Sequence, residues 1–301
     1  MIWLDYVLGQ TVVSLKKILV IGASGLLGSK LVDALSKRYE VFPSHNTQAV
    51  YPNSIRMDVV DRERVLRIIS EIKPDFVVHA AAETNVDKCE TDRELAWSVN
   101  AEGTRNIAEA CRRVGARLVY ISTDYVFDGE KGLYSEEEPA RPVNYYGLTK
   151  LKGEEFVREL CEDFIIVRTS VLYGWHQRKL NFATWVIDSL RNGKTINVVE
   201  DHCNSPTLAD NLAEMIVEIV GMDVTGVYHL AGSERASRYD FAMKIADVFG
   251  FDRSLIMPAK MKDLKVWVAK RPQDSSLSVD KAKHELKVSL LDVREGLRRM
   301  L

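Results

Sequence analysis

The sequence lacks the features that mark membrane and nucleic-acid-binding proteins. Its longest stretch without a formal charge, Val41 to Ile55, is interrupted by Pro43 and Pro52, whereas a transmembrane helix needs about 20 mostly apolar residues. Lys plus Arg number 41 and Asp plus Glu 43, so the formal net charge is −2. Nucleic-acid-binding domains are usually strongly basic. Neither a membrane nor a nucleic acid is therefore expected as a partner.

Cysteine and histidine patterns are equally sparse. The four cysteines, Cys89, Cys111, Cys161 and Cys203, form no CxxC pair and are too few for a disulfide scaffold. The six histidines show neither HExxH nor HxH spacing, so no metal site is expected. Reduced thiols of this kind favour a cytoplasmic protein.

A chain of 301 residues is expected to form about two domains, at roughly 150 residues each. Residues 1–16 have no basic region and carry Asp5 before a short apolar run, which disfavours a signal peptide. They are interpreted as an extension before the first strand or as a start codon set too far upstream.

Short apolar runs alternate with helical patterns from residue 17 to about 172. Strands are predicted at Lys17–Ile21, Tyr39–Phe42 (ended by Pro43), Phe76–Ala80, Leu118–Ile121 and Phe164–Val167, and long helices at Asp61–Ile72, Asp92–Val114 and Tyr145–Leu160. Such alternation is typical of βαβ units. It predicts an α/β fold of Rossmann type: a doubly wound parallel sheet over 17–172, with 173–301 forming mainly a smaller α/β substrate-binding lobe from which some segments return to the sheet.

A glycine turn, Gly22-x-x-Gly25-x-x-Gly28, joins the first strand to a helical pattern. Glycine permits close approach of a pyrophosphate, and the N–H groups of a helix N-terminus attract the anion. This context predicts dinucleotide binding, with a structural glycine turn as the alternative. The end of the second strand lacks the acidic residue that binds the ribose 2′-hydroxyl of NAD. The cofactor is therefore predicted to be NADP(H), or either of NADP(H) and NAD(H). His45 either faces a 2′-phosphate or is an exposed loop histidine.

Tyr146 and Lys150 lie four residues apart in a predicted helix, hence on one face. A nearby ammonium lowers the pKa of a phenol, which then exchanges a proton with a carbonyl oxygen. Thr123 follows a predicted strand, at the carboxyl end where parallel-sheet enzymes bind their ligands. Its hydroxyl is placed to bond the same oxygen.

With these motifs in order, the chain resembles the extended short-chain dehydrogenase/reductase family. The segments that carry the resemblance are GASGLLG, HAAAETNVDKCE from His79, SVNAEGT around Asn100, STDYVFDG from Ser122 and YGLTK from Tyr146. AAETNVDKCE, STDYVFDG and RTSVLYG from Arg168 are most similar to the dTDP-4-dehydrorhamnose reductase branch, which serves dTDP-L-rhamnose synthesis. The likeness runs from about Lys17 to the C-terminus, including Arg271-Pro272.

The resemblance implies an NAD(P)H-dependent oxidoreductase that reduces the C4 keto group of a nucleoside-diphospho-6-deoxy-4-keto-hexose. It implies catalysis by Thr123, Tyr146 and Lys150, with Asn100 assisting through a water-linked proton path. It also implies homodimers. The implied cofactor residues are Gly22, Ser24, Gly25, Leu26, Leu27, His45, Asp58, Val59, Ala80, Ala81, Ala82, Thr84, Tyr146, Lys150 and Thr169, and the implied substrate residues are Val86, Asp87, Thr123, Asp124, Tyr125, Asn181, Phe182 and Arg271.

Several of these assignments have structural alternatives. Asn100 either assists catalysis or only bends its helix, Phe182 either meets substrate or fills the core, and Asp87 is a substrate residue, a cap or a surface charge.

Two departures from the family pattern bear on function. The related dehydratases have an Asp-Glu pair after the catalytic threonine, whereas Asp124 is followed here by Tyr125. The reductases commonly have tryptophan where this chain has Val171, and Trp175 either compensates or only packs. Two other functions remain as alternatives: a nucleotide-sugar 4-epimerase with tightly bound NAD, and a non-catalytic subunit similar to the β subunit of methionine adenosyltransferase.

Overall fold

The computed structural model describes residues 15–177, 180–263 and 267–301. Of the predicted N-terminal extension, residues 1–14 lie outside this range. A seven-stranded parallel sheet has the order β11-β6-β5-β4-β1-β2-β3. Its strands are β1 (Lys17–Ile21), β2 (Glu40–His45), β3 (Ile55–Arg56), β4 (Phe76–His79), β5 (Arg117–Thr123), β6 (Phe164–Thr169) and β11 (Gly226–His229).

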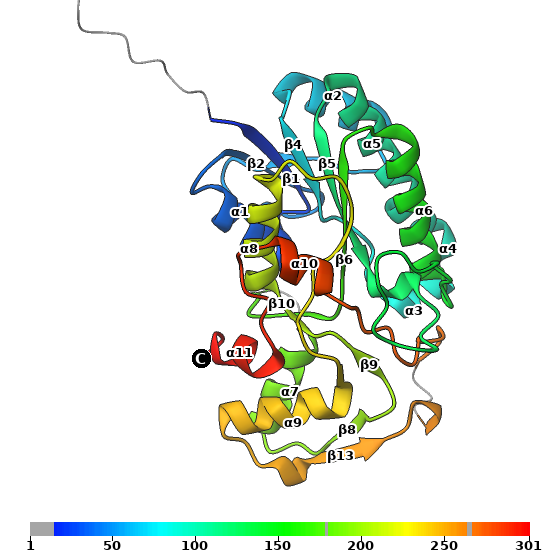
Figure 1. Cartoon of the computed structure of the whole chain (residues 1–301), viewed down its shortest axis with the longest axis vertical. Coiled ribbons are helices and arrows are strands. Elements are labelled where there is room, and N and C mark those ends of the chain that lie inside the picture. Colours follow the sequence, from blue (N-terminus) through cyan, green and yellow to red (C-terminus); the bar gives the residue numbers. More distant parts are fainter. Residues whose placement is uncertain (1–14, 178–179, 264–266) are drawn as a thin grey trace, which may run out of the picture.

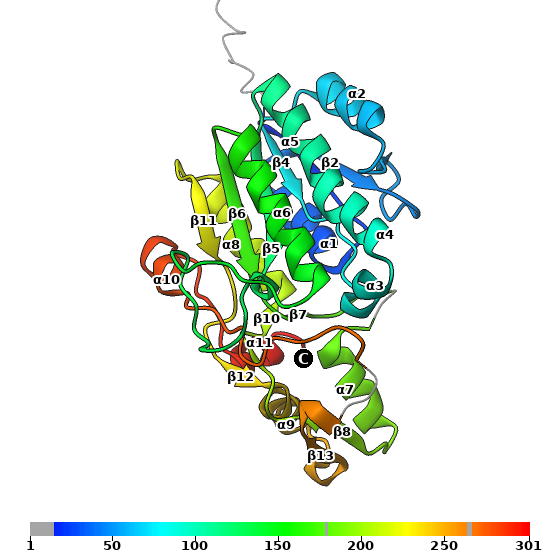
Figure 2. The same ribbon diagram turned by 90° about the vertical axis from the view of Figure 1, so that its right-hand side faces the viewer.

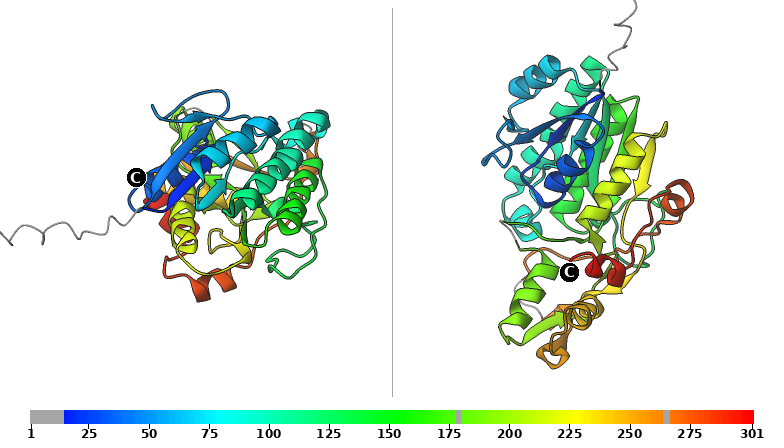
Figure 3. Two further views of the ribbon diagram at one scale, coloured as in Figure 1. Left: turned by 90° about the horizontal axis from the view of Figure 1, so that it is seen from above. Right: turned by 90° about the vertical axis from the view of Figure 1, so that its left-hand side faces the viewer.

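Helices cover both faces of the sheet, as predicted (Figure 1). Helices α2 (Arg62–Ile72), α5 (Gly103–Val114) and α6 (Tyr145–Leu160) pack on one face, and Figure 2 shows α5 and α6 in front of it. On the other face, α1 (Leu26–Leu35) packs against α8 (Ala209–Val220), as Figure 3 shows from the opposite side. Both layers bury the apolar faces of their helices, so the sheet is shielded from water on each side.

The smaller lobe has a core of its own beside the sheet. It is built from α7 (Phe182–Arg191), β8 (Ile196–Val199), α9 (Arg238–Phe249), β13 (Ile256–Ala259) and α11 (Val293–Arg298). Figure 1 shows these elements together below the sheet. Between α7 and α9 the chain returns to the sheet, where α8 and β11 add to its layers. The lobes are therefore interleaved in sequence.

The remaining helices and strands are short. They are α3 (Val86–Thr91), α4 (Arg93–Trp97), β7 (Leu172–Tyr173), β9 (Cys203–Asn204), β10 (Thr207–Leu208), β12 (Ala236–Ser237) and α10 (Asp280–Glu285). The side chains of Ser237 and Asp240 form the predicted capping box at the start of α9.

Two element predictions were wrong in detail. The second strand does not end at Pro43 but continues to His45. Proline is tolerated there because β3 pairs only with Ser44 and His45, so Pro43 lies where one side of β2 has no neighbouring strand. The predicted long helix from Asp92 is α4 and α5 joined by a π-helical turn over Ser98–Glu102.

No helix among the described residues is long and apolar enough to cross a membrane. All four cysteines are free thiols.

Candidate active site

A cleft of about 870 Å³ opens at the carboxyl ends of β1, β4, β5 and β6 and extends to the smaller lobe. The strand order reverses between β1 and β4, the position at which open α/β sheets bind their ligands. The cleft brings together most of the predicted site residues: Gly22, Ser24, Gly25, Leu26, Leu27, Asp58, Val59, Ala80, Ala81, Ala82, Thr84, Thr123, Asp124, Tyr146, Lys150, Thr169, Asn181 and Phe182.

The glycine turn packs too tightly for side chains at two of its three positions. A Cβ on Gly22 would lie 2.8 Å from the backbone nitrogen of Ala81, and its φ of +87° is in the left-handed region. A Cβ on Gly28 would lie 2.1 Å from the carbonyl oxygen of Gly22. The following helix, α1, has no acidic residue in its first turn and no side-chain cap at Gly25. Its first N–H groups therefore face the cleft with nothing to compete with a phosphate.

The end of β2 carries no acidic side chain towards the cleft. The ring nitrogen Nδ1 of His45 lies 2.8 Å from the hydroxyl of Ser54, and the cleft is lined instead by Asn46, Thr47 and Gln48. The structure thus contradicts the interpretation of His45 as an exposed loop histidine, because Ser54 holds a partly buried ring. His45 is also not among the residues that line the cleft, so the structure does not support its predicted contact with the cofactor.

Thr123, Tyr146 and Lys150 meet at one end of the cleft. Thr123 is the last residue of β5, and its hydroxyl is close enough to Tyr146 to lower the pKa of the phenol. The Nζ of Lys150 donates a 2.7 Å hydrogen bond to the carbonyl oxygen of Ile121 and lies 4.1 Å from the ring centroid of Tyr120. These contacts hold the lysine against β5, one turn after Tyr146 in α6.

Burial sets the protonation of this group. It raises the pKa of Tyr146, and the nearby hydroxyl of Thr123 opposes the rise only in part. Burial lowers the pKa of Lys150 to about 7, against the attraction of Glu154. Tyr146 therefore holds its proton at neutral pH. The lowering of its pKa that was expected from Lys150 is not seen, because the effect of burial dominates.

Asn100 lies outside the cleft, in the middle of the π-helical turn. Its Oδ1 accepts a 2.8 Å hydrogen bond from the backbone of Glu83, and its Nδ2 donates to the Glu83 carbonyl and to the hydroxyl of Thr149, each at 3.1 Å. It thus ties the loop after β4 to the helix that carries Lys150. Single π-helical turns inside longer helices are frequent at functional sites.

Asp124, the residue after β5, connects the end of that strand to the smaller lobe. Its Oδ2 accepts hydrogen bonds from the hydroxyls of Ser170 and Ser275, at 2.9 and 2.6 Å, and from the amide of Asn204 at 3.3 Å. Only 3% of Asp124 is exposed. Burial raises the pKa of Asp124, while these hydrogen bonds lower it.

Four predicted substrate residues, Val86, Asp87, Tyr125 and Arg271, are not among the residues that line the cleft. The carboxylate of Asp87 accepts a 2.8 Å ion-pair hydrogen bond from Arg271 and two of 2.9 Å from the backbone of Val268 and Ala269. These bonds fasten the chain before Arg271 to α3, so Asp87 is no free surface charge. Tyr125 is buried, with its ring centroid 6.0 Å from that of Tyr146.

The smaller lobe and the chain leading to it contribute cleft residues that the motifs did not indicate. Arg238 and His176 line the cleft, and Nε2 of His176 lies 3.2 Å from the Ser24 carbonyl oxygen. Val171, which the sequence did mark as the position where the reductases commonly have tryptophan, lines it too, with a φ of +44° that is rare for a β-branched residue. Trp175 does not compensate for Val171 inside the cleft, because its indole N–H donates a 2.8 Å hydrogen bond to the carbonyl of Met300. The cluster of Gly, Trp, His and Asn residues from Gly174 to Asn181 was the available signal for His176, whereas no motif marked Arg238.

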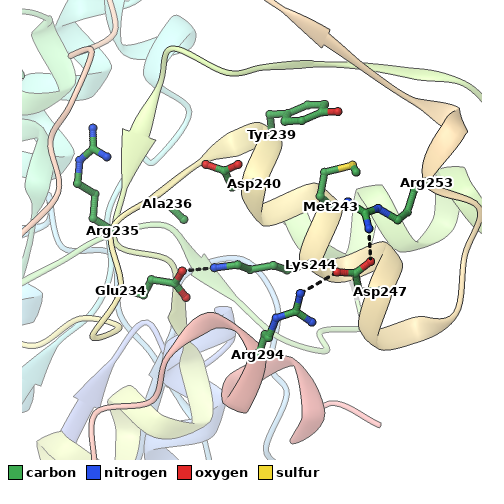
Figure 4. A pocket seen from close by; sticks show the side chains of 10 residues that line it. All are labelled: Glu234, Arg235, Ala236, Tyr239, Asp240, Met243, Lys244, Asp247, Arg253 and Arg294. Atoms are coloured by element: carbon green, nitrogen blue, oxygen red, sulfur yellow. Dashed lines mark hydrogen bonds and ion pairs between the residues drawn. The ribbon is translucent and has the colours of Figure 1, made fainter.

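A second hollow, of about 520 Å³, lies beside α9 on the smaller lobe (Figure 4). Five of its seven charged side chains are paired with one another: Lys244 with Glu234, and both Arg253 and Arg294 with Asp247. This hollow therefore offers little unbalanced charge to a ligand.

Comparison with known proteins places these features in a family. The model of the RmlD substrate binding domain matches residues 16–301. A probable low-salt glycan biosynthesis reductase of Haloferax volcanii is 35% identical over 285 residues, which cover 92% of this chain and 95% of the relative. Methionine adenosyltransferase 2 subunit beta of Xenopus laevis is 30% identical over 292 residues, covering 93% and 85%. The crystal structure of dTDP-4-dehydrorhamnose reductase from Bacillus anthracis in complex with NADP matches with a TM-score of 0.86 and 33% identity, covering 95% and 98%.

Proposed function

Because the chain belongs to the RmlD substrate-binding family, we propose that it reduces the C4 keto group of a nucleoside-diphospho-6-deoxy-4-keto-hexose with NADP(H), as in dTDP-L-rhamnose synthesis. One observation carries the proposal: Thr123, Tyr146 and Lys150 line the same cleft as an uncapped helix N-terminus behind a tight glycine turn. That combination joins a proton donor to a dinucleotide-binding surface.

The residues of the cleft fit a dinucleotide. Gly22 and Gly28 leave backbone at the cleft wall where side chains would clash, and the N–H groups at the start of α1 are free to bind a pyrophosphate. Asp58 and Val59 line the part of the cleft next to β2, where the adenine is expected. When bound, NADPH supplies the hydride.

The chain's own residues supply the proton and the orientation. Tyr146 donates its proton to the oxygen that carries negative charge after reduction, and Thr123 orients that oxygen through its hydroxyl. Lys150, as an ammonium, favours the phenolate that Tyr146 becomes. General acid catalysis of this kind contributes roughly 10²–10⁴-fold to the rate.

Cofactor choice follows from the end of β2. Asn46, Thr47 and Gln48 offer amide and hydroxyl groups and no negative charge, so nothing there repels a 2′-phosphate. We expect kcat/KM with NADPH to equal or exceed that with NADH. A large preference for NADH would contradict this assignment.

A non-catalytic binding subunit is the second candidate, favoured by the similarity to methionine adenosyltransferase 2 subunit beta. Against it, a pure binding protein has no need for Thr123, Tyr146 and Lys150 together. An epimerase is the third, and it differs in holding NAD tightly without net consumption. Incubation with NADPH and a panel of nucleoside-diphospho-4-keto-6-deoxy sugars separates the three, since only the reductase oxidises NADPH in proportion to sugar reduced.

Assembly and location belong to the same proposal. A cytoplasmic enzyme agrees with four free cysteines. The homodimer implied by the family resemblance stays a prediction, to be checked by light scattering.

A further inference from the structure

A buried ion pair connects α6 to the strands β5 and β6. Glu154 of α6 accepts hydrogen bonds of 2.9 and 2.8 Å from the Nε and Nη2 of Arg168 in β6. Its Oε1 also accepts a 2.6 Å hydrogen bond from the hydroxyl of Ser122 in β5, the residue that pairs with Arg168 between the two strands. Glu154 is 0% exposed and Arg168 is 3% exposed. Figure 2 shows α6 lying over these strands.

Stability alone does not explain such a pair. Taking two charges out of water costs about as much as their attraction returns, so apolar side chains in their place are often equally stable. The other surroundings of Arg168 do not neutralise it: its guanidinium carbon lies 5.1 Å from the ring centroid of Phe127, and its Nη1 has no hydrogen-bond partner among the described residues. Burial raises the pKa of Glu154, but the bond and charge of Arg168, with the hydroxyl of Ser122, hold it below its usual value. The pair therefore maintains an ionised carboxylate in the interior.

Glu154 continues the row of residues that carries the proton donor. Tyr146, Lys150 and Glu154 are spaced four residues apart, so they lie on one face of α6 in successive turns. Lys150 donates its 2.7 Å hydrogen bond to the carbonyl of Ile121. Glu154 bonds to the next residue of β5, Ser122. These two bonds together fix α6 against the end of β5.

Glu154 supplies the negative charge that acts on Lys150. The titratable groups packed near Lys150 come from four elements: Tyr146 and Glu154 of α6, Tyr120 of β5, His79 of β4 and Cys89 of α3. Burial raises the pKa of both tyrosines and of Cys89 and lowers the pKa of His79, so these four groups are uncharged at neutral pH. Burial lowers the pKa of Lys150, and the attraction of Glu154 is the largest effect that opposes it.

We propose that Glu154, held by Arg168, is a positioning residue that fixes Lys150 one turn from Tyr146 and keeps its ammonium charged. The inference deepens the proposed reductase function and rests on it for the role of Lys150. As an ammonium, Lys150 favours the phenolate that forms when Tyr146 donates its proton. Loss of the Glu154 charge should therefore weaken the cation on which this proton transfer depends.

Carbon NMR of the full chain with isotopically labelled lysine tests this without turnover. The signal of Lys150 is identified by its loss in Lys150→Met, and its midpoint in the wild type should lie at about pH 7. Glu154→Gln keeps the shape of the side chain and removes its charge, so it should lower this midpoint by about one pH unit. The matched control Glu155→Gln removes the same charge from the next residue, which pairs with Lys152 at the surface, and should leave the midpoint unchanged.

Replacing both partners separates this role from a structural one. Glu154→Met combined with Arg168→Met leaves neither charge unpaired, and such replacements are often neutral or stabilising. The double variant should resist urea at least as well as Glu154→Gln, yet show the same lowered midpoint of Lys150. A pair that served only the fold would instead have its loss repaired by the double replacement.

The pH profile of turnover provides a second readout. At about pH 8, kcat of Glu154→Gln should fall about tenfold, because a shift of one pH unit above both midpoints leaves about a tenth as much lysine charged. The loss should shrink towards about pH 6, where most of the wild-type lysine and half of the variant lysine are charged. The KM for the keto sugar should change little, because Glu154 does not line the cleft.

Three results would overturn the proposal. One is a wild-type midpoint of Lys150 in Glu154→Gln or in the double variant. Another is a loss of kcat that is the same at every pH. The third is failure of both variants to fold, because the pair would then serve the fold alone. A lowered midpoint in Glu154→Gln, together with a wild type that reduces no keto sugar, would instead refute only the reductase function.

Discussion

The hydroxyl of Ser275 donates a 2.6 Å hydrogen bond to the carboxylate of Asp124, although 151 residues separate them in the chain. Asp124 follows the catalytic candidate Thr123, whose hydroxyl also bonds to it at 3.2 Å. The segment after Arg271 thus braces the end of β5 from the side of the smaller lobe. A late part of the sequence thereby supports the position of the proton-donating group.

Ser275→Ala is expected to destabilise the fold by about 1–3 kcal/mol, because a buried acceptor loses a partner. It should also raise the pKa of Asp124 further, since the Ser275 bond is a cause that lowers it. Urea denaturation measures the loss. Ser278→Ala is the control, because its hydroxyl bonds to the exposed carboxylate of Asp280 and should change stability by no more than about 0.5 kcal/mol. Equal effects of the two variants would contradict the bracing role.

Tyr146→Phe should lower kcat by roughly 10²–10⁴-fold, because the proton donor is removed while the ring remains. NADPH affinity, measured by fluorescence titration, should change little. Tyr145→Phe is a matched control from the same helix, since that tyrosine stacks with Arg93 at 4.9 Å outside the cleft. Near-normal turnover of the Tyr146 variant would remove Tyr146 from the mechanism.

Gly25 and Gly28 should respond differently to alanine. Gly25 has an extended backbone, and its added Cβ would meet only the Gly22 carbonyl at 3.4 Å. Gly25→Ala should therefore leave the unfolding temperature nearly unchanged yet weaken NADPH binding, because the methyl group stands at the phosphate-binding turn. Gly28→Ala should weaken both, because its Cβ would lie 2.1 Å from backbone oxygen. Calorimetry with and without NADPH separates the two effects, and a Gly28 variant as stable as the wild type would contradict the packing.

The buried ammonium of Lys150 should make stability depend on pH. Its folded-state pKa is about 7 and its ordinary value is 10.5, so the unfolded chain binds more protons between these values. Stability relative to Lys150→Met should therefore rise from about pH 7 to about pH 10 and be flat below about pH 7. Urea titrations of both proteins without cofactor measure this difference. A difference that stays constant over that range would show that Lys150 keeps its ordinary pKa, and one that falls would show that its pKa is raised; either result contradicts the lowered pKa.

The sequence predicted the sheet domain well because its signals are local. Buried strands such as Lys17–Ile21 are continuous apolar runs, and the glycine turn and the Tyr146–Lys150 spacing each depend on neighbouring residues. What could not be predicted depends on contacts distant in sequence. Arg238 reaches the cleft because α9 packs against α7, and Asp87 forms an ion pair with Arg271, 184 residues later in the chain. The π-helical turn at Asn100 has no periodicity signal, and Pro43 stays in a strand because β3 is short.

The central claim is that this cleft reduces a nucleotide-bound 4-keto sugar, and the oxidation of NADPH during incubation with such a sugar tests it most directly. The absorbance of NADPH should fall in a one-to-one ratio with the reduced sugar formed, and Tyr146→Phe should slow the decline by roughly 10²–10⁴-fold. No oxidation with any sugar of the panel, from a folded chain that binds NADPH, would contradict the account and favour the binding subunit.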